Sequence, residues 1–129
     1  MNGKRRATPK QAFAIVTLIA VVTLCGTWAA AQSERGNPKN GETVYRQQCL
    51  RCHGEHLDGQ GPEARWLIVP PADLTSLKSR SKEDWELLVS IYHGVLFTPM
   101  HGFRDTLSYD QIRDVLSYIR HVAPYGGIG

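Results

Sequence analysis

The stretch Cys49-Leu50-Arg51-Cys52-His53 constrains the fold of this chain more than any other part of it. Two cysteines two residues apart, with a histidine directly after the second, have the spacing typical of covalent haem c attachment. Each thiol can add across one vinyl group of the porphyrin, and His53 then lies under the ring with an imidazole nitrogen toward the iron. The motif therefore predicts one haem c, held through Cys49 and Cys52, with His53 as an axial ligand.

A Cys-x-x-Cys pair also occurs in redox-active dithiols and in zinc sites. A thioredoxin-like dithiol lies near a βαβ pattern, and no strand-rich run flanks this motif. A structural zinc site needs four ligands, typically including a second Cys or His pair. The third cysteine, Cys25, lies in an apolar N-terminal segment, and the remaining histidines show no paired ligand spacing. These observations favour haem over dithiol or zinc chemistry.

Residues 1–31 have the three parts of a secretory signal peptide. Four basic residues precede an uncharged apolar stretch from about Ala12 to Trp28, and Ala29-Ala30-Ala31 supplies a small-residue cleavage site. Cleavage before Gln32 would place the protein in the periplasm, on the side where bacteria attach haem c. The run Ala12–Ala31 is also long enough to span a bilayer. As an uncleaved anchor it would tether the domain to the inner membrane, facing the periplasm.

The basic charge of the chain belongs to this export segment. The whole chain carries 15 Lys and Arg against 12 Asp and Glu, a formal net charge of +3. Without residues 1–31 the chain retains 11 basic and 12 acidic residues, so its charge gives no support for nucleic-acid binding. We expect a flexible lead-in over residues 32–36 and one small domain over 37–129, whose modest core packs around the haem.

The first predicted helix carries the cysteine motif on its last turn. Asn37 is a favourable N-cap, Pro38 a favourable first residue, and Gly54 ends the helix. Frequent Gly and Pro predict a loop from about residue 53 to residue 80, with a short helical turn near residues 63–67.

Two further helices follow. Ser81-Lys82-Glu83-Asp84 resembles a capping box with Asp in place of Glu, and the helix behind it ends at Gly94. Ser108-Tyr109-Asp110-Gln111 is a better capping box, and Pro124 ends the last helix. Apolar residues recur at helical spacing in both helices: Trp85, Leu88, Val89 and Tyr92, then Ile112, Val115, Leu116 and Ile119. The predicted fold class is all-α, and Trp85 and Tyr92 are expected in the core.

Met100 is the only methionine after residue 31. It lies in Thr98-Pro99-Met100-His101-Gly102-Phe103, between the last two predicted helices, where Pro and Gly disfavour helix. A haem iron bound to histidine has a second axial position, and we assign Met100 to it, a ligand that raises the reduction potential. His101 is expected to be solvated or to face a haem propionate, although it could compete for the iron if the loop opened.

These features together resemble a class I (monohaem) cytochrome c over about Asn37 to Val122. The stretches Asp58-Gly59-Gln60-Gly61 and Pro70-Pro71-Ala72-Asp73-Leu74 are similar to bacterial domains in the haem subunits of terminal oxidases and dehydrogenases. The resemblance implies three to five helices packed around one covalent haem. It also implies an electron carrier rather than an enzyme, with redox proteins as transient donor and acceptor.

The resemblance implies further residue assignments. The first and last helices should cross at Gly41, and Tyr45 should pack against the last helix at Leu116, Tyr118 or Ile119. A proline carbonyl in the loop after the motif should accept the other imidazole N–H of His53. Pro71 is the first candidate and Pro62 the second, and the spacing does not decide between them.

The sequence thus predicts a periplasmic electron shuttle. The alternatives are a membrane-anchored haem subunit of a larger respiratory oxidoreductase, and a haem enzyme or gas sensor with an open sixth site. Membrane contact is expected only if the N-terminal segment stays uncleaved. The expected partner-contact rim consists of Gln47, Gln48, Leu50, Thr98 and Phe103. Candidates to hydrogen-bond the haem propionates are Arg65, Trp66, Lys78, Arg80 and Arg104.

Overall fold

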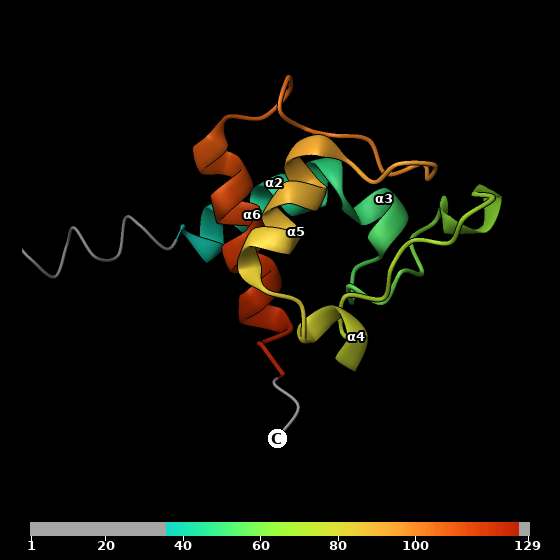
Figure 1. Cartoon of the computed structure of the whole chain (residues 1–129), viewed down its shortest axis with the longest axis horizontal. Coiled ribbons are helices and arrows are strands. Elements are labelled where there is room, and N and C mark those ends of the chain that lie inside the picture. Colours follow the sequence, from blue (N-terminus) through green and yellow to red (C-terminus); the bar gives the residue numbers. More distant parts are fainter. Residues whose placement is uncertain (1–35, 127–129) are drawn as a thin grey trace, which may run out of the picture. The chain divides into compact units, whose positions relative to one another are not determined.

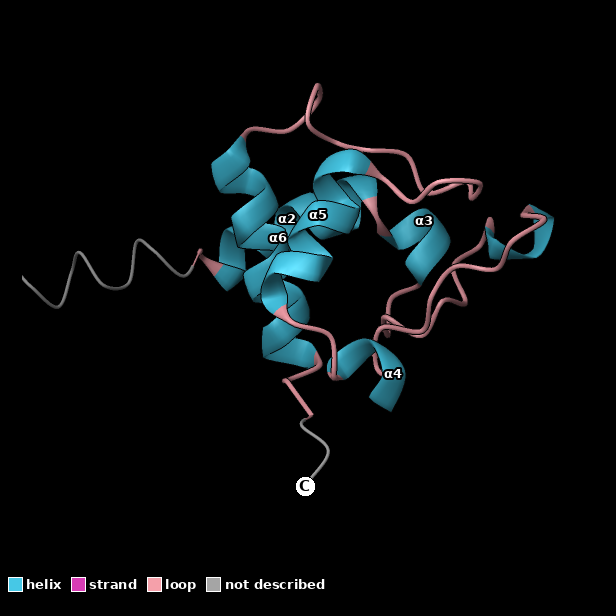
Figure 2. Cartoon of the chain, viewed as in Figure 1, coloured by secondary structure: helices cyan, strands magenta, loops and turns pink. Residues whose placement is uncertain are grey.

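Helices α2 (Pro38–Gln48) and α6 (Tyr109–Val122) cross each other and support the rest of the domain (Figure 1). The computed structural model describes residues 36–126. The predicted export segment 1–31, and all but the last residue of the predicted lead-in 32–36, lie outside these residues. Between the two helices come α3 (Leu50–His53), the 3₁₀ helix η1 (Ala64–Trp66), α4 (Leu77–Arg80) and α5 (Asp84–His93). Loops join them, and no strand occurs over residues 36–126, which confirms the all-α class (Figure 2).

Gly41 allows α2 and α6 to approach closely. A Cβ atom at this position would lie 1.9 Å from the carbonyl oxygen of Asp114 and 2.9 Å from Cβ of Tyr118. One turn later, Tyr45 is buried with its ring centroid 5.3 Å from that of Tyr118. The predicted crossing is confirmed, since only a residue without a Cβ fits at this point.

Side-chain caps fix where both long helices begin. The Asn37 side-chain oxygen accepts the N–H groups of Lys39 and Asn40 at 3.0 and 3.3 Å. The N–H of Asn37 donates to Oδ1 of Asp114 on α6 at 2.5 Å, so the start of α2 is attached to its partner helix. At α6, the predicted capping box is present, with Ser108 and Gln111 satisfying each other's backbone N–H groups.

The first predicted helix is interrupted just before the motif. Helix α2 ends at Gln48, and Cys49 is the joint between α2 and α3, with φ −114° and its N–H still bonded to the Tyr45 carbonyl. Helix α3 then ends at Gly54, whose φ of +80° suits glycine. Leu50–His53 therefore form a helix of their own rather than the last turn of the first one, and Cys49 caps it.

The start of α5 and the presence of α4 correct two predictions. Ser81 is the C-cap of α4 rather than a start signal, because α4, capped by Ser76, occupies what was expected to be loop. The capping box of α5 uses Glu83 and Glu86 instead. The short turn predicted near residues 63–67 is present as η1.

The core lies where α2, α5 and α6 meet. All four apolar residues predicted on α6 are buried, but on α5 the buried residues are Leu87 and Ile91. Trp85, expected in the core, is 67% exposed, which makes that prediction wrong; Tyr92 is partly buried against the core. Over residues 36–126, no helix is long and apolar enough to cross a bilayer.

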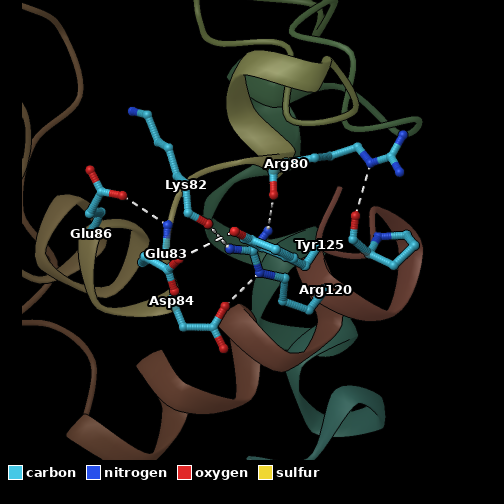
Figure 3. Close-up of polar contacts among 8 residues, drawn as sticks. Arg80, Lys82, Glu83, Asp84, Glu86, Arg120 and Tyr125 are labelled. Carbon is cyan, nitrogen blue, oxygen red and sulfur yellow. Dashed lines mark hydrogen bonds and ion pairs between the residues drawn. The ribbon is translucent and has the colours of Figure 1, made fainter. Parts of the chain in front are cut away.

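Arg120 of α6 joins α4 and the start of α5 to the last helix (Figure 3). Its Nε donates to Oδ1 of Asp84 at 2.6 Å, its Nη1 to the Arg80 carbonyl at 3.2 Å, and its Nη2 to the Lys82 carbonyl. Arg80 in turn donates from Nε to the Pro124 carbonyl at 2.9 Å. These bonds fix the segment between α4 and α5, which includes Lys82.

Candidate haem site

A pocket of about 240 Å³ is lined by residues of α2, α3, α4, α5 and α6 and of the two long loops. Figure 2 shows how these helices and loops are arranged. Cys49, Cys52, His53 and Met100 all line the pocket, so the structure brings the four predicted haem residues to one place. The other lining residues are mostly apolar: Leu67, Val69, Pro70, Pro71, Ala72, Leu74, Leu87, Ile91, Val95, Pro99, Phe103, Val115 and Ile119. Among the described residues, no Asp or Glu lines the pocket.

His53 is held by the loop that follows the motif. Its Nδ1 lies 3.2 Å from the carbonyl oxygen of Ala72. Burial lowers the pKa of His53, while the bond to Ala72 opposes that shift. The imidazole is thus favoured in its neutral form, with Nδ1–H directed at Ala72 and the other nitrogen free to bind a metal.

The structure places the carbonyl of Ala72 at His53, where Pro71 or Pro62 was predicted. The Pro71 carbonyl instead faces Gly59, where an added Cβ would lie 2.7 Å from it. Two residues after Ala72, the Leu74 N–H donates to the Leu57 carbonyl at 2.8 Å. This bond fixes which loop residue lies opposite His53. The spacing of residues in the sequence does not show which loop carbonyl lies opposite His53. The first candidate, Pro71, was therefore one residue before the observed partner, Ala72.

Tyr45 supports the end of the motif helix. Its hydroxyl donates to the carbonyl of Gly54 at 2.7 Å in a buried bond, and burial is the main cause that raises the Tyr45 pKa. The hydroxyl therefore stays protonated and continues to donate. This bond was not foreseen, since it depends on the break between α2 and α3.

Both motif cysteines are partly buried and free of disulfides. Burial, with a smaller contribution from Cys52, raises the pKa of the Cys49 thiol to about 12. A neutral thiol at this position is not poised as a redox-active thiolate, which agrees with haem attachment rather than dithiol chemistry.

Met100 is held in a tight loop between Gly94 and Gly102. Val95 N–H donates to the Met100 carbonyl at 2.9 Å, and Met100 N–H donates to Oγ1 of Thr98 at 3.2 Å. An added Cβ at Gly94 or at Gly102 would each meet opposing backbone at 2.7 Å. Both backbone polar groups of Met100 are therefore satisfied within the loop.

The residues beside Met100 only partly match the predicted contact rim. Gln47 and Gln48 are exposed, and Leu50 and Thr98 are partly buried. Phe103 is 4% exposed and belongs to the core, so the prediction that it lies on the rim is wrong. Its backbone N–H donates to the carbonyl of Ile91, and this bond holds the residue against α5. The sequence missed two exposed residues of this loop, Leu96 and Phe97, which are 84% and 98% exposed. His101 is exposed, as expected, with its ring 4.6 Å from that of Phe103.

None of the five residues predicted to hold the haem propionates lines the pocket. Arg80 bonds to Pro124, and Arg65 lies over the ring of Trp66, which is 74% exposed. Lys82, two residues after the end of α4, lines the pocket instead of the predicted residues.

The crossed helices, with a Cys-x-x-Cys-His helix and a methionine loop at one pocket, define a class I c-type cytochrome. The chain belongs to the family of cytochrome c oxidase, cbb3-type, subunit III, whose model matches residues 36–119. The cofactor of this class is haem c, and its role is electron transfer. The residues fit that cofactor, since two thiols, an imidazole and a thioether line a largely apolar pocket.

Two known proteins contain regions similar to this chain. The chain is 36% identical over 89 residues to one subunit of the nicotinate dehydrogenase of Pseudomonas putida. That match covers 64% of this chain and 7% of the relative, so the chain spans a small part of that protein. The reducing HAO-like protein complex of Kuenenia stuttgartiensis has the same fold, with a TM-score of 0.61 at 24% identity. The match covers 67% of this chain and 43% of that one.

Proposed function

We propose that this chain is a periplasmic electron carrier with one covalent haem c, bound through Cys49 and Cys52 and ligated by His53 and Met100. The supporting observation is that these four side chains line one pocket, with no carboxylate among the described residues of its wall. When bound, the haem supplies a one-electron iron couple. The protein contributes the ligands, their orientation and low solvent access, and it needs neither a nucleophile nor a general base.

Covalent attachment needs no oxidant. The sulfur of each thiol bonds to one vinyl carbon, and its hydrogen goes to the other carbon. Haem colour that survives denaturation and acid–acetone extraction is the expected result for the protein matured in a periplasm. Loss of all colour on extraction would contradict the proposal.

Met100 as the second axial ligand is tested against its neighbour His101. Methionine sulfur on ferric iron gives a weak far-red charge-transfer band, and the ligand raises the reduction potential. Met100→Ala should remove the band and lower the potential, whereas His101→Ala should change neither. If His101→Ala removed the band and Met100→Ala did not, the assignment would be reversed.

Carbon monoxide separates an electron carrier from a haem enzyme or gas sensor. A stable Met100 ligand should prevent rapid binding of carbon monoxide to the reduced protein at neutral pH. The loop bonds at Val95 and Thr98 support this expectation, because they hold Met100 on both sides. Rapid and complete binding would favour an open sixth site instead.

Electron exchange is proposed at the rim formed by Gln47, Gln48, Leu50, Thr98 and the exposed Phe97. Contacts between electron-transfer partners are small and brief. Leu50→Lys together with Phe97→Lys should slow reduction by the physiological donor, while reduction by a small artificial reductant stays unchanged. Equal slowing of both reactions would show that the substitutions alter the site rather than the contact.

A second candidate is a membrane-anchored haem subunit of a larger oxidoreductase. The similarity to a small part of a dehydrogenase subunit favours it. N-terminal sequencing of the mature protein, together with cell fractionation, distinguishes the two. A chain that begins at Gln32 in the periplasmic fraction supports the free carrier, and an intact Ala12–Ala31 in the membrane fraction supports the anchored subunit.

A further inference from the structure

We infer that Lys82 binds a haem propionate and so forms the anion-binding end of the pocket. This inference rests on the proposed attachment at Cys49 and Cys52. The two vinyl groups lie on one edge of the porphyrin and the two propionates on the opposite edge. Covalent bonds at the motif therefore direct both carboxylates away from α3, toward whatever lies across the pocket.

The segment between α4 and α5 contributes a basic side chain to the pocket wall. Figure 1 shows α4 well separated from α3, which carries the motif. Lys82 lies just after α4 and lines the pocket, and it is the only Lys or Arg among the described lining residues. With no Asp or Glu in that same described wall, the local field favours an anion.

The hydroxyl groups that line the pocket are already donating to the backbone. Tyr45 donates to Gly54 at 2.7 Å, Ser79 to Asp73 at 2.5 Å and Ser90 to Glu86 at 2.8 Å. Thr98 likewise donates to Val95 at 2.9 Å. A carboxylate accepts bonds and cannot share these protons without breaking a backbone contact.

The Lys82 ammonium is available by contrast. No described carboxylate lies within ion-pair distance of it, and its side chain extends away from Arg120 in Figure 3. Only its backbone is engaged, since its carbonyl accepts from Arg120 and its N–H donates to the Ser79 carbonyl at 3.3 Å. The Arg120 contacts thus hold the backbone in place and leave three ammonium donors for a ligand.

The test compares Lys82→Gln with Lys78→Gln. Both remove one positive charge from neighbouring exposed positions, but Lys78 does not line the pocket. The reduction potential of the holo-protein is measured against pH, which gives the pKa of the propionate coupled to the iron. Loss of a cation in direct contact should raise that pKa by about one unit in Lys82→Gln. Lys78→Gln should leave it near the wild-type value, and Lys82→Arg should retain the wild-type value.

A second readout does not depend on electron transfer. The propionate bending band in resonance Raman spectra should shift in Lys82→Gln and stay unchanged in Lys78→Gln. Equal behaviour of the two Gln variants, or failure of Lys82→Arg to keep the wild-type values, would overturn the inference. Covalent haem content is measured first in each protein: its absence from the wild type contradicts the proposed function, whereas its presence with no Lys82 effect contradicts this inference alone.

Discussion

Replacing Gly41 by Ala tests the close crossing of α2 and α6. The added Cβ would lie 1.9 Å from the Asp114 carbonyl oxygen, whereas real Cβ contacts essentially never fall under 3.0 Å. The opposing atoms are backbone, so no flexible side chain can move aside. The two helices must therefore separate by roughly 1 Å, a gap that removes about a quarter to a half of the dispersion attraction across it.

Two effects of opposite sign set the magnitude. Within a helix, Gly to Ala alone stabilises by about 1 kcal/mol. Overpacking costs about 3 kcal/mol at the upper end of its usual range, the appropriate end when the neighbour is backbone. The net loss in the free energy of unfolding is therefore about 2 kcal/mol. For a domain of this size that loss lowers Tm by on the order of 10 °C.

The assay is urea unfolding of the oxidised holo-protein, followed by far-ultraviolet circular dichroism. Asn40→Ala is the matched control, because Asn40 is the exposed neighbour on the same helix and its side chain makes none of the described hydrogen bonds. That variant should gain a few tenths of a kcal/mol from helix propensity alone. If Gly41→Ala were as stable as Asn40→Ala, the close crossing would not exist as described.

Three further substitutions test local features. Tyr45→Phe removes the buried bond to the Gly54 carbonyl and should cost about 1–2 kcal/mol in urea unfolding. Phe97→Gly should stabilise by about 1 kcal/mol, because Phe97 has φ +61° and its side chain is 98% exposed; Phe97→Ala should not. Bonds from Thr75 lower the pKa of Asp73, so the stability they provide is present at neutral pH and is lost as pH falls through that lowered pKa. The difference in Tm between wild type and Asp73→Ala should therefore shrink as the solution is acidified, and a difference that stays constant until Asp73 is fully protonated would refute this.

The helix starts that the sequence predicted correctly are determined by residues close together in the sequence. Asn37 with Pro38, and Ser108 with Gln111, act through hydrogen bonds within one helical turn, so their meaning does not depend on the rest of the fold. The crossing at Gly41 was implied by the resemblance to class I cytochromes c, and it agrees with the cost of a glycine inside a helix, which is favoured only where another segment comes close.

The errors arose where a distant segment decides the outcome. Ser81 has the residue type of an N-cap, but the preceding helix α4 ends on it, and Glu83 takes the role. Trp85 fits a helical apolar stripe, yet the contacts of α5 with α6 bury Leu87 and Ile91 instead. Apolar spacing gives the existence of a helix but leaves its rotation about its own axis to tertiary packing.

The motif helix itself illustrates the same dependence. Helix α3 has four residues, too few to be stable alone, and its last carbonyls lack partners within the helix. The loop supplies these partners in order, since Glu63, Gly61 and Gly59 donate to the carbonyls of Arg51, Cys52 and His53 at 2.9, 3.1 and 2.9 Å.

Two glycines make this arrangement sterically feasible. At Gly61 a Cβ would press into the backbone of α3, and at Gly59 it would press against the Pro71 carbonyl. The same loop then continues to Ala72, whose carbonyl orients His53. The conformation of the haem-binding motif is therefore set by the segment that follows it, and Cys49-Leu50-Arg51-Cys52-His53 identifies the chemistry without determining the geometry that performs it.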